Sequence, residues 1–223
     1  MNEKIRKIWK KYSHSWVFLY TLVYVSWYLY LERTVVRSYN LIHCKLDDLI
    51  PFNEYFVIPY FYWFIYMIVG CLFFFFKDRD EFYRYAFFIT IGMSTCLLIC
   101  QIYPNGTNLR PALDIEKNWA TKMVGFIYRV DTDTNVFPSI HVYNSIGTHI
   151  AIMKSKYFQH HFRVRLFSGF SCIIISLSTV FLKQHSVLDG LAAFLLAAIM
   201  YALIYGGVSE TEESTEKGRE PAV

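Results

Sequence analysis

The chain has 223 residues, of which 55% are hydrophobic, 19% aromatic and only 18% charged. This composition is too apolar and too aromatic for a disordered protein. The apolar residues gather in long, nearly uncharged runs, which argues against soluble domains. A net charge of +4 suits a membrane surface and does not by itself indicate a nucleic-acid partner, and we expect none.

The apolar runs predict an all-α, integral membrane bundle. Several of them approach or exceed the roughly 18–20 residues that a bilayer-spanning helix needs. In chain order the expected spans are Trp16–Leu31, Tyr55–Phe76, Tyr85–Tyr103, Phe137–Met153, Leu166–Leu182 and Ser186–Gly206. We therefore expect a bundle of six transmembrane helices.

Two of these spans need further argument. Trp16–Leu31 is short and follows a basic segment, as in a signal peptide, but no small-residue cleavage site follows it, so we expect an uncleaved first helix. The polar residues of the fourth span are His141, Asn144, Thr148 and His149. Because lipid cannot surround such side chains, this span must face other helices, and its polar residues are candidates for function.

Lys and Arg residues indicate the orientation of the chain. The segments on the same side of the membrane as the N-terminus carry more Lys and Arg than the segments on the opposite side. This distribution favours a cytoplasmic location for both termini. The predicted organisation is a basic cytoplasmic segment (1–15), a six-helix membrane domain (16–206) and a polar, Glu-rich, disordered tail (207–223). We expect a multi-pass protein of the cell membrane.

The loops show less decisive patterns. The long outer loop (104–136) contains a stretch, "KNWATKMVGFIYRV", that is either an interfacial helix or a helix packed over the bundle. "HCKLDD" (43–48) lacks the spacing of metal ligands and is expected to be a loop, and "DTDTN" (131–135) is expected to form a turn. The five cysteines include no CxxC pair, so we expect neither disulfides nor a metal site.

Polar residues recur at the outer ends of the expected spans. Arg110 follows the third span, His141 opens the fourth, His185 closes the fifth and Asp189 begins the sixth. His185 and Asp189 are four residues apart and share a helix face, so the carboxylate can fix which ring nitrogen is free. Arg offers donors that match phosphate oxygens. With two imidazoles, this set can attack phosphorus and protonate a leaving oxygen.

These residues carry a family resemblance. Arg110–Pro111, "PSIH" at 138–141, and Ser178–Thr179 followed by His185 and Asp189 resemble the three ordered motifs of the type 2 phosphatidic acid phosphatase superfamily. That superfamily includes membrane lipid phosphatases and the phosphotransferases that make inositol phosphorylceramide. The resemblance covers residues 55–206 and implies a six-helix layout with a site that faces outward.

The resemblance also implies a role for each matching residue. His185 would be the nucleophile that forms a phosphohistidine, and Asp189 would orient it. His141 would protonate the leaving alcohol and then activate the incoming water or alcohol. Arg110 would bind phosphate oxygens, with a further hydrogen bond from Ser139. Neither a metal nor another cofactor is implied, because fixed donors would stabilise the transition state.

The sequence departs from the family pattern at three positions. Tyr103 stands in place of a Lys, Ile140 in place of a Gly and Thr179 in place of an Arg. Two expected cations are therefore missing from the phosphate pocket, which moves the expectation toward the phosphotransferase branch. Lys183 is the first candidate for a substitute, and Arg129 is the second.

The function expected from these motifs is that of a metal-independent phosphatase acting on lipid phosphates at the outer membrane face. Phosphatidic acid, phosphatidylglycerol phosphate and polyprenyl pyrophosphate are the implied substrate classes. One alternative is a phosphotransferase that moves a phospho-headgroup to an alcohol or lipid acceptor. Another is a non-enzyme, either a small transporter or a structural membrane protein, although no repeat typical of transporters is present. The acceptor and the oligomeric state stay open.

Overall fold

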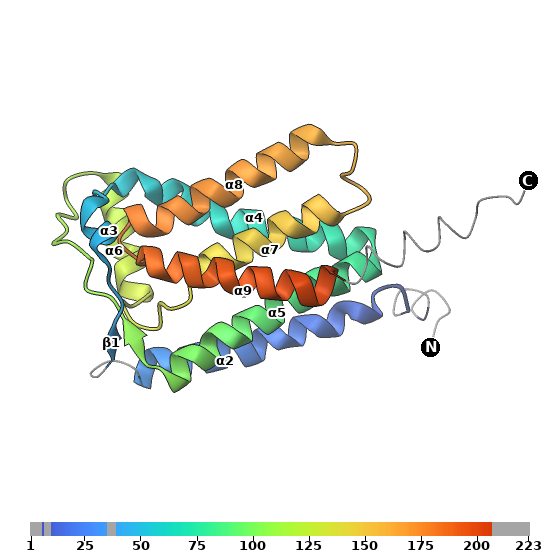
Figure 1. Ribbon diagram of the computed structural model, residues 1–223, viewed down its shortest axis with the longest axis horizontal. Coiled ribbons are helices and arrows are strands. Elements are labelled where there is room, and N and C mark those ends of the chain that lie inside the picture. Colours follow the sequence, from blue (N-terminus) through green and yellow to red (C-terminus); the bar gives the residue numbers. More distant parts are fainter. Residues whose placement is uncertain (1–5, 7–9, 35–38, 207–223) are drawn as a thin grey trace, which may run out of the picture.

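The apolar runs form long helices that lie side by side along one axis (Figure 1). The computed structural model describes residues 6, 10–34 and 39–206. In chain order its elements are η1 (Ser13–Phe18), α2 (Leu19–Thr34), β1 (Asn40–Leu41), α3 (Lys45–Leu49), η2 (Glu54–Phe56), α4 (Val57–Lys77), α5 (Arg79–Ile102), β2 (Asn105–Gly106), α6 (Trp119–Val130), α7 (Ile140–Lys154), α8 (Phe162–Phe181) and α9 (Val187–Tyr205). Most of the expected basic segment (1–15) and the whole expected tail (207–223) lie outside the described residues.

The described residues confirm an all-helical membrane protein, with a long helix in each of the six expected ranges. Four of these helices, α4, α5, α8 and α9, are long and apolar enough to cross a membrane. The other two are shorter: α2 has 16 residues and α7 has 15. At 1.5 Å per residue each is about 22–24 Å long, less than the roughly 30 Å of a hydrocarbon core. The short η1 leads directly into α2 and lengthens that segment.

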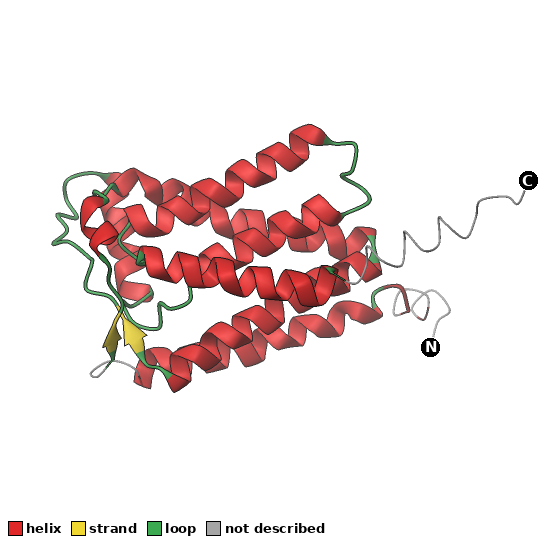
Figure 2. Cartoon of the chain, viewed as in Figure 1, coloured by secondary structure: helices red, strands yellow, loops and turns green. Residues whose placement is uncertain are grey.

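Short elements gather at one end of the bundle (Figure 2). There β1 and β2 pair in parallel, with Asn40 opposite Asn105 and Leu41 opposite Gly106. This pairing attaches the segment after α2 to the loop after α5. The start of η1 and the end of α9 both lie at the opposite end of the bundle (Figure 1).

Helix α7 is the centre of the bundle and contacts α4, α5, α8 and α9. Its polar residues Asn144 and Thr148 are fully buried, as the sequence predicted for a span that faces other helices. His149 makes the interhelical hydrogen bond expected of such a residue, because its Nδ1 lies 3.0 Å from Ser168 Oγ on α8. The burial of α7 among the other helices explains how a helix with these polar side chains is accommodated in the bundle.

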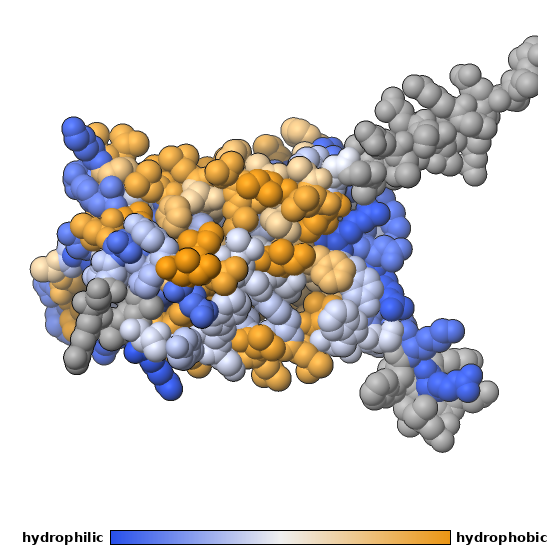
Figure 3. All heavy atoms as spheres, turned by 60° about the horizontal axis from the view of Figure 1, so that its bottom comes forward, coloured by the Kyte–Doolittle hydropathy of each residue, from blue (hydrophilic) through white to orange (hydrophobic). Residues whose placement is uncertain are grey.

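The outward faces of the surrounding helices are apolar. Large exposed hydrophobic side chains include Ile58, Phe64, Ile91, Phe170, Phe194 and Leu203. On the face shown in Figure 3, hydrophobic residues predominate along the length of the bundle, and hydrophilic residues are concentrated toward its two ends. A soluble protein rarely exposes so large an apolar surface, whereas lipid tails cover it favourably.

Close packing of α5 against α7 leads to a first prediction, for Gly92→Ala. A Cβ atom at Gly92 would lie 1.9 Å from Cζ of Tyr143, whose hydroxyl donates a 2.7 Å hydrogen bond to Phe88 O. Because that bond holds the ring in place, we expect the variant to lose about 1–3 kcal/mol of stability. Thermal unfolding in detergent measures this loss. Gly190→Ala is the matched control, since nothing lies within 4 Å of its Cβ; an equal melting temperature for the two variants would contradict the prediction.

Candidate functional site

The loop between α8 and α9 presents His185 with a fixed orientation. Its Nδ1 lies 3.1 Å from Oδ2 of Asp189, in the first turn of α9. The same oxygen accepts a 2.9 Å hydrogen bond from Ser186 N, which completes a capping box at the start of α9. Since an ionised carboxylate only accepts hydrogen bonds, Nδ1 carries the proton and Nε2 is the nitrogen with a free lone pair.

His141 lies near His185, in the first turn of α7. The centroids of the His141 and His185 rings are 5.7 Å apart. On its other sides His141 packs against Tyr60 and Trp63 of α4, with centroid distances of 4.6 and 4.5 Å. Its Nδ1 is buried without a hydrogen-bond partner. The structure therefore brings His141 close to His185 and Asp189, the other two predicted catalytic residues, although it lies more than 40 residues before them in the chain.

Ser139 joins α7 to α9 and does not line the cavity beside the histidines. Its side chain caps α7 by accepting a hydrogen bond from Val142 N, and its backbone N–H donates to Asp189 O at 3.2 Å. The serine is fully buried. In this arrangement Ser139 positions the starts of both helices, while the expected hydrogen bond to phosphate stays a prediction.

A cavity of about 290 Å³ lies beside the two histidines. Its walls come from α2, α4, α6 and the loop before α7. Aromatic rings predominate, with Tyr24, Tyr28, Tyr60, Phe61, Trp63, Phe64 and Phe126 among them. The polar lining residues are Asp131, Thr132, Thr134, Asn135, Gln184 and the two histidines. The cavity is therefore a mostly apolar space with reactive groups at one side, as ligand sites commonly are.

Arg110 lies behind this cavity and is not among its lining residues. Its guanidinium donates to the backbone carbonyls of Tyr128, Asp131 and Thr132, at 3.2, 2.8 and 2.7 Å, and packs over the Tyr128 ring. It also donates to Oε1 of Gln184, the residue before His185. Arg110 thus reaches the histidines through Gln184, and its direct contact with phosphate stays a prediction.

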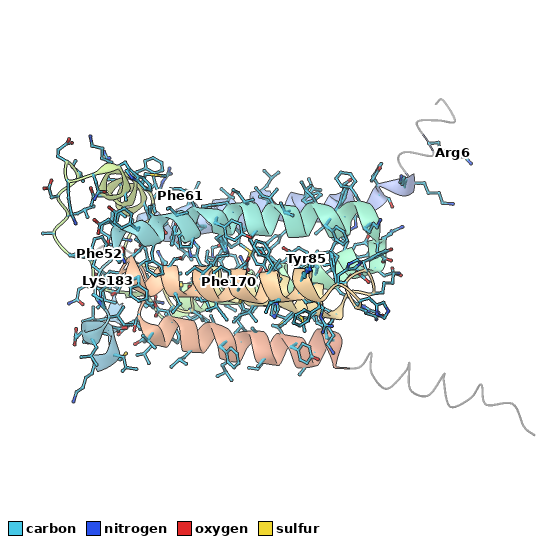
Figure 4. All side chains as sticks on the ribbon, turned by 90° about the horizontal axis from the view of Figure 1, so that it is seen from above. Arg6, Phe52, Phe61, Tyr85, Phe170 and Lys183 are labelled. Carbon is cyan, nitrogen blue, oxygen red and sulfur yellow. The ribbon has the colours of Figure 1, made fainter. Side chains whose placement is uncertain are left out.

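Lys183 points away from the histidines. Its Nζ donates to the backbone carbonyl of Asp47 in α3, and the residue has a φ of 55° and is buried. Figure 4 shows Lys183 at the same end of the bundle as Phe52. The second candidate, Arg129, is exposed, and its Nε donates to Gly125 O. Neither residue lines the cavity, so their geometry gives the proposed substitution of the missing cations no support.

Asp47 is a structural residue of this site, although the sequence pattern predicted only that it would be part of a loop. Its carboxylate accepts hydrogen bonds from Ser186 Oγ at 2.6 Å, Val187 N at 2.8 Å and Cys44 N at 2.8 Å. Burial raises the pKa of this carboxyl, but these hydrogen bonds outweigh it and lower the pKa below its ordinary value. Asp47 therefore holds α3 against the start of α9. A carboxylate inside a short polar stretch was the only signal in the sequence.

The turn predicted at 131–135 also contributes to the site. Asp131 Oδ1 and Oδ2 accept hydrogen bonds from Tyr28 and Tyr60 at 3.1 and 2.9 Å. Thr132 and Asn135 bind Glu32 of α2. Within the turn the Thr132 and Thr134 hydroxyls lie 2.9 Å apart, Thr134 N donates to Thr132 Oγ1, and Asn135 Nδ2 donates to Thr134 Oγ1. The Asp131 carboxylate pairs instead with tyrosines of two helices.

Helix α6 packs over the bundle, as one of the two predictions for its segment stated, and its position in the membrane interface stays a prediction. One face packs on the bundle through Ala120, Val124 and Ile127. Trp119, Met123, Phe126 and Val130, at helical spacing, form an exposed apolar stripe. Among the described residues no group of His, Cys, Asp and Glu could hold a metal ion.

Comparisons of the chain with models of known protein families, with curated proteins and with solved structures found no match.

Proposed function

We propose that the protein is a membrane enzyme that transfers the phosphoryl group of a lipid phosphate ester through a phosphohistidine at His185. The supporting observation is the arrangement of the two histidines. Asp189 fixes the proton on His185 Nδ1, and the His141 ring lies 5.7 Å away across the edge of an apolar cavity. A nucleophile, an orienting carboxylate and a second acid–base group are the parts that this chemistry needs.

In the first step, the lone pair of His185 Nε2 attacks phosphorus and the bond from phosphorus to the lipid oxygen breaks. Protonated His141 gives its proton to that oxygen as the alcohol leaves. In the second step, neutral His141 removes a proton from water or an alcohol, which attacks phosphorus and breaks the P–N bond. Both histidines return to their starting states, so the cycle balances. Asp189 stabilises the positive charge that develops on His185 in the first step.

Gln184 supports binding of the phosphate. Arg110 has only donors, so the oxygen of the Gln184 amide faces Arg110, and the NH2 group of this cavity-lining residue is left for another acceptor. That nitrogen is buried and has no partner. A phosphate oxygen is a suitable acceptor, and the guanidinium makes the amide a stronger donor by polarising it. In this proposal Arg110 acts on the phosphate through Gln184.

Phosphotransfer to an alcohol or lipid acceptor is the second candidate function. The observation that favours it is the absence of Lys and Arg from the described residues that line the cavity. A phosphate monoester carries more negative charge than a phosphodiester, so its binding needs more positive charge from the protein. A cavity lined by neither Lys nor Arg therefore suits a phosphodiester substrate better. We place the site at the outer face of the cell membrane, in agreement with the distribution of Lys and Arg along the sequence.

Turnover of defined lipids tests the proposal. The purified protein in maltoside detergent with EDTA is offered phosphatidic acid, phosphatidylglycerol phosphate, undecaprenyl pyrophosphate, and a phosphatidylcholine with an isotopically labelled diacylglycerol acceptor, so that exchange of the headgroup can be detected. We expect release or transfer of phosphate from at least one of them, together with an acid-labile, base-stable phosphoryl label on the chain. No label and no turnover with any of these lipids would favour a transporter or structural protein instead.

A further inference from the structure

The cavity beside the histidines has a negative charge where a phosphate pocket usually has positive ones. Among the described residues that line it, Asp131 is the carboxylate, and neither Lys nor Arg is present. The salt bridges of the described residues do not include Asp131. A ligand with only a phosphate would therefore face an unbalanced anion across a small, mostly apolar space.

The Asp131 carboxylate is held in place without being neutralised. Tyr28 donates to Oδ1 and Tyr60 donates to Oδ2. Arg110 contacts only the backbone oxygen of Asp131. Hydroxyl donors orient an ionised carboxylate and leave its charge in place, so a cation brought by the ligand would find a prepared partner.

Aromatic rings surround the same space. Tyr60 and Trp63 pack on His141, and Tyr24 and Tyr28 stand next to each other on α2 with their ring centroids 6.3 Å apart. All four rings line the cavity. The faces of Trp and Tyr rings attract ammonium groups, and quaternary ammonium most characteristically, because their quadrupole presents negative charge.

Gln184 marks where the phosphate of the same ligand would lie. This residue is 2% exposed, lines the cavity next to His185, and has its Nε2 donor unpartnered. An unpaired buried donor destabilises the protein, and an acceptor on a ligand would remove that cost. Asp131 reaches the histidines through one hydrogen bond to Tyr60 and one ring contact from Tyr60 to His141. The anion-binding and cation-binding sides are thus adjacent.

The size and rim of the cavity fit a headgroup attached to lipid. About 290 Å³ is near the lower end of the roughly 300–1,000 Å³ of ligand sites. Three lining residues, Phe64, Phe126 and Val130, are also exposed large hydrophobic side chains. Acyl chains can therefore continue from the cavity onto the apolar outer surface.

We propose that this cavity binds the zwitterionic headgroup of a phospholipid, with a choline or ethanolamine ammonium at Asp131 and the rings and the phosphate at Gln184 and His185. This inference rests on the proposed function and narrows its substrate to phosphodiesters with a cationic headgroup. His185 Nε2 attacks phosphorus, the bond to the diacylglycerol oxygen breaks, and His141 protonates that oxygen. The headgroup phosphate stays on His185 until water or an alcohol displaces it.

Binding measured separately from turnover tests the headgroup. Tryptophan fluorescence in maltoside detergent follows titration with dihexanoylphosphatidylcholine, dihexanoylphosphatidic acid or free phosphocholine. We expect the choline lipid to bind at least about ten-fold tighter than the acid. Asp131→Asn should remove most of that preference. Asp133→Asn should keep it, because Asp133 is a nearby carboxylate that does not line the cavity. Tetramethylammonium chloride should compete more strongly than sodium chloride at equal ionic strength, a test that needs no variant.

The outcomes separate this inference from the proposed function. Equal or tighter binding of phosphatidic acid, or a preference that survives Asp131→Asn, overturns the headgroup inference even if phosphatidic acid is hydrolysed. Binding of free phosphocholine as tight as that of the choline lipid overturns the assignment to a lipid. Choline preference without any phosphohistidine supports the headgroup site and contradicts the proposed chemistry.

Discussion

We expect His185→Ala to abolish the proposed turnover of lipid phosphate and Asp189→Asn to reduce it by about 10²–10⁴-fold. Removing the imidazole removes the proposed nucleophile. In Asp189→Asn the amide oxygen can still accept from Ser186 N and His185 Nδ1, but the neutral amide no longer stabilises the positive charge that develops on His185. The rate of turnover and the phosphoryl label on the chain both measure the effect.

Two observations separate a chemical role from a structural one. His160→Ala is the matched control, because His160 is an exposed histidine in the loop between α7 and α8, at the other end of the bundle. Asp189→Asn should change the pH profile of the surviving activity, since the proton on His185 is no longer fixed by a carboxylate. Full activity in His185→Ala, at a normal melting temperature, would rule out the proposed nucleophile.

Asp47→Ala costs about 3 kcal/mol of stability and loosens the start of α9. The variant leaves three donors, Cys44 N, Ser186 Oγ and Val187 N, without their charged acceptor. Ser186 caps α9 and precedes Asp189 by one turn, so turnover should fall together with stability. Thermal unfolding in detergent measures the first effect, and activity at low temperature measures the second.

The pH dependence of that stability follows from the lowered pKa of Asp47. A carboxyl with a lowered pKa in the folded state stabilises the protein above its unfolded pKa of about 3.9, and the contribution is lost as pH falls through the folded pKa. Acidification to about pH 3 should therefore reduce the melting temperature of the wild type more than that of Asp47→Ala. Asp48→Ala is the control, because Asp48 is exposed and pairs only with His43. A loss of stability in Asp48→Ala as large as in Asp47→Ala would contradict the account.

Local sequence patterns were sufficient for the helices and for the central pair. Long uncharged runs predicted a helix in every expected range, since burial in lipid requires such runs whatever the partner helices are. The four-residue spacing of His185 and Asp189 predicted their contact, although His185 lies in the loop just before the N-cap Ser186 and only Asp189 lies in the first turn of α9. The ranges expected from the sequence did not show that α2 and α7 would be the shortest of the six long helices. Length alone does not decide whether these two helices cross the membrane.

The remaining site residues were set by contacts between distant segments. Arg110 and Lys183 were candidates because of their charge, but the carbonyls of the loop after α6 and of α3 take up their donors. Asp47 contributes to the site because α3 packs on the start of α9. Gln184 contributes because Arg110 contacts it in the loop before α9. No spacing in the sequence encodes these approaches.

The sequence by itself determined an all-helical membrane chain and the local geometry of His185 with Asp189, because periodicity, apolar length and helix spacing act over neighbouring residues. The tertiary structure decided which charges face the cavity. A guanidinium or ammonium group binds the nearest unsatisfied carbonyls once the helices are packed, and Asp131 reaches the cavity wall only through tyrosines on two other helices.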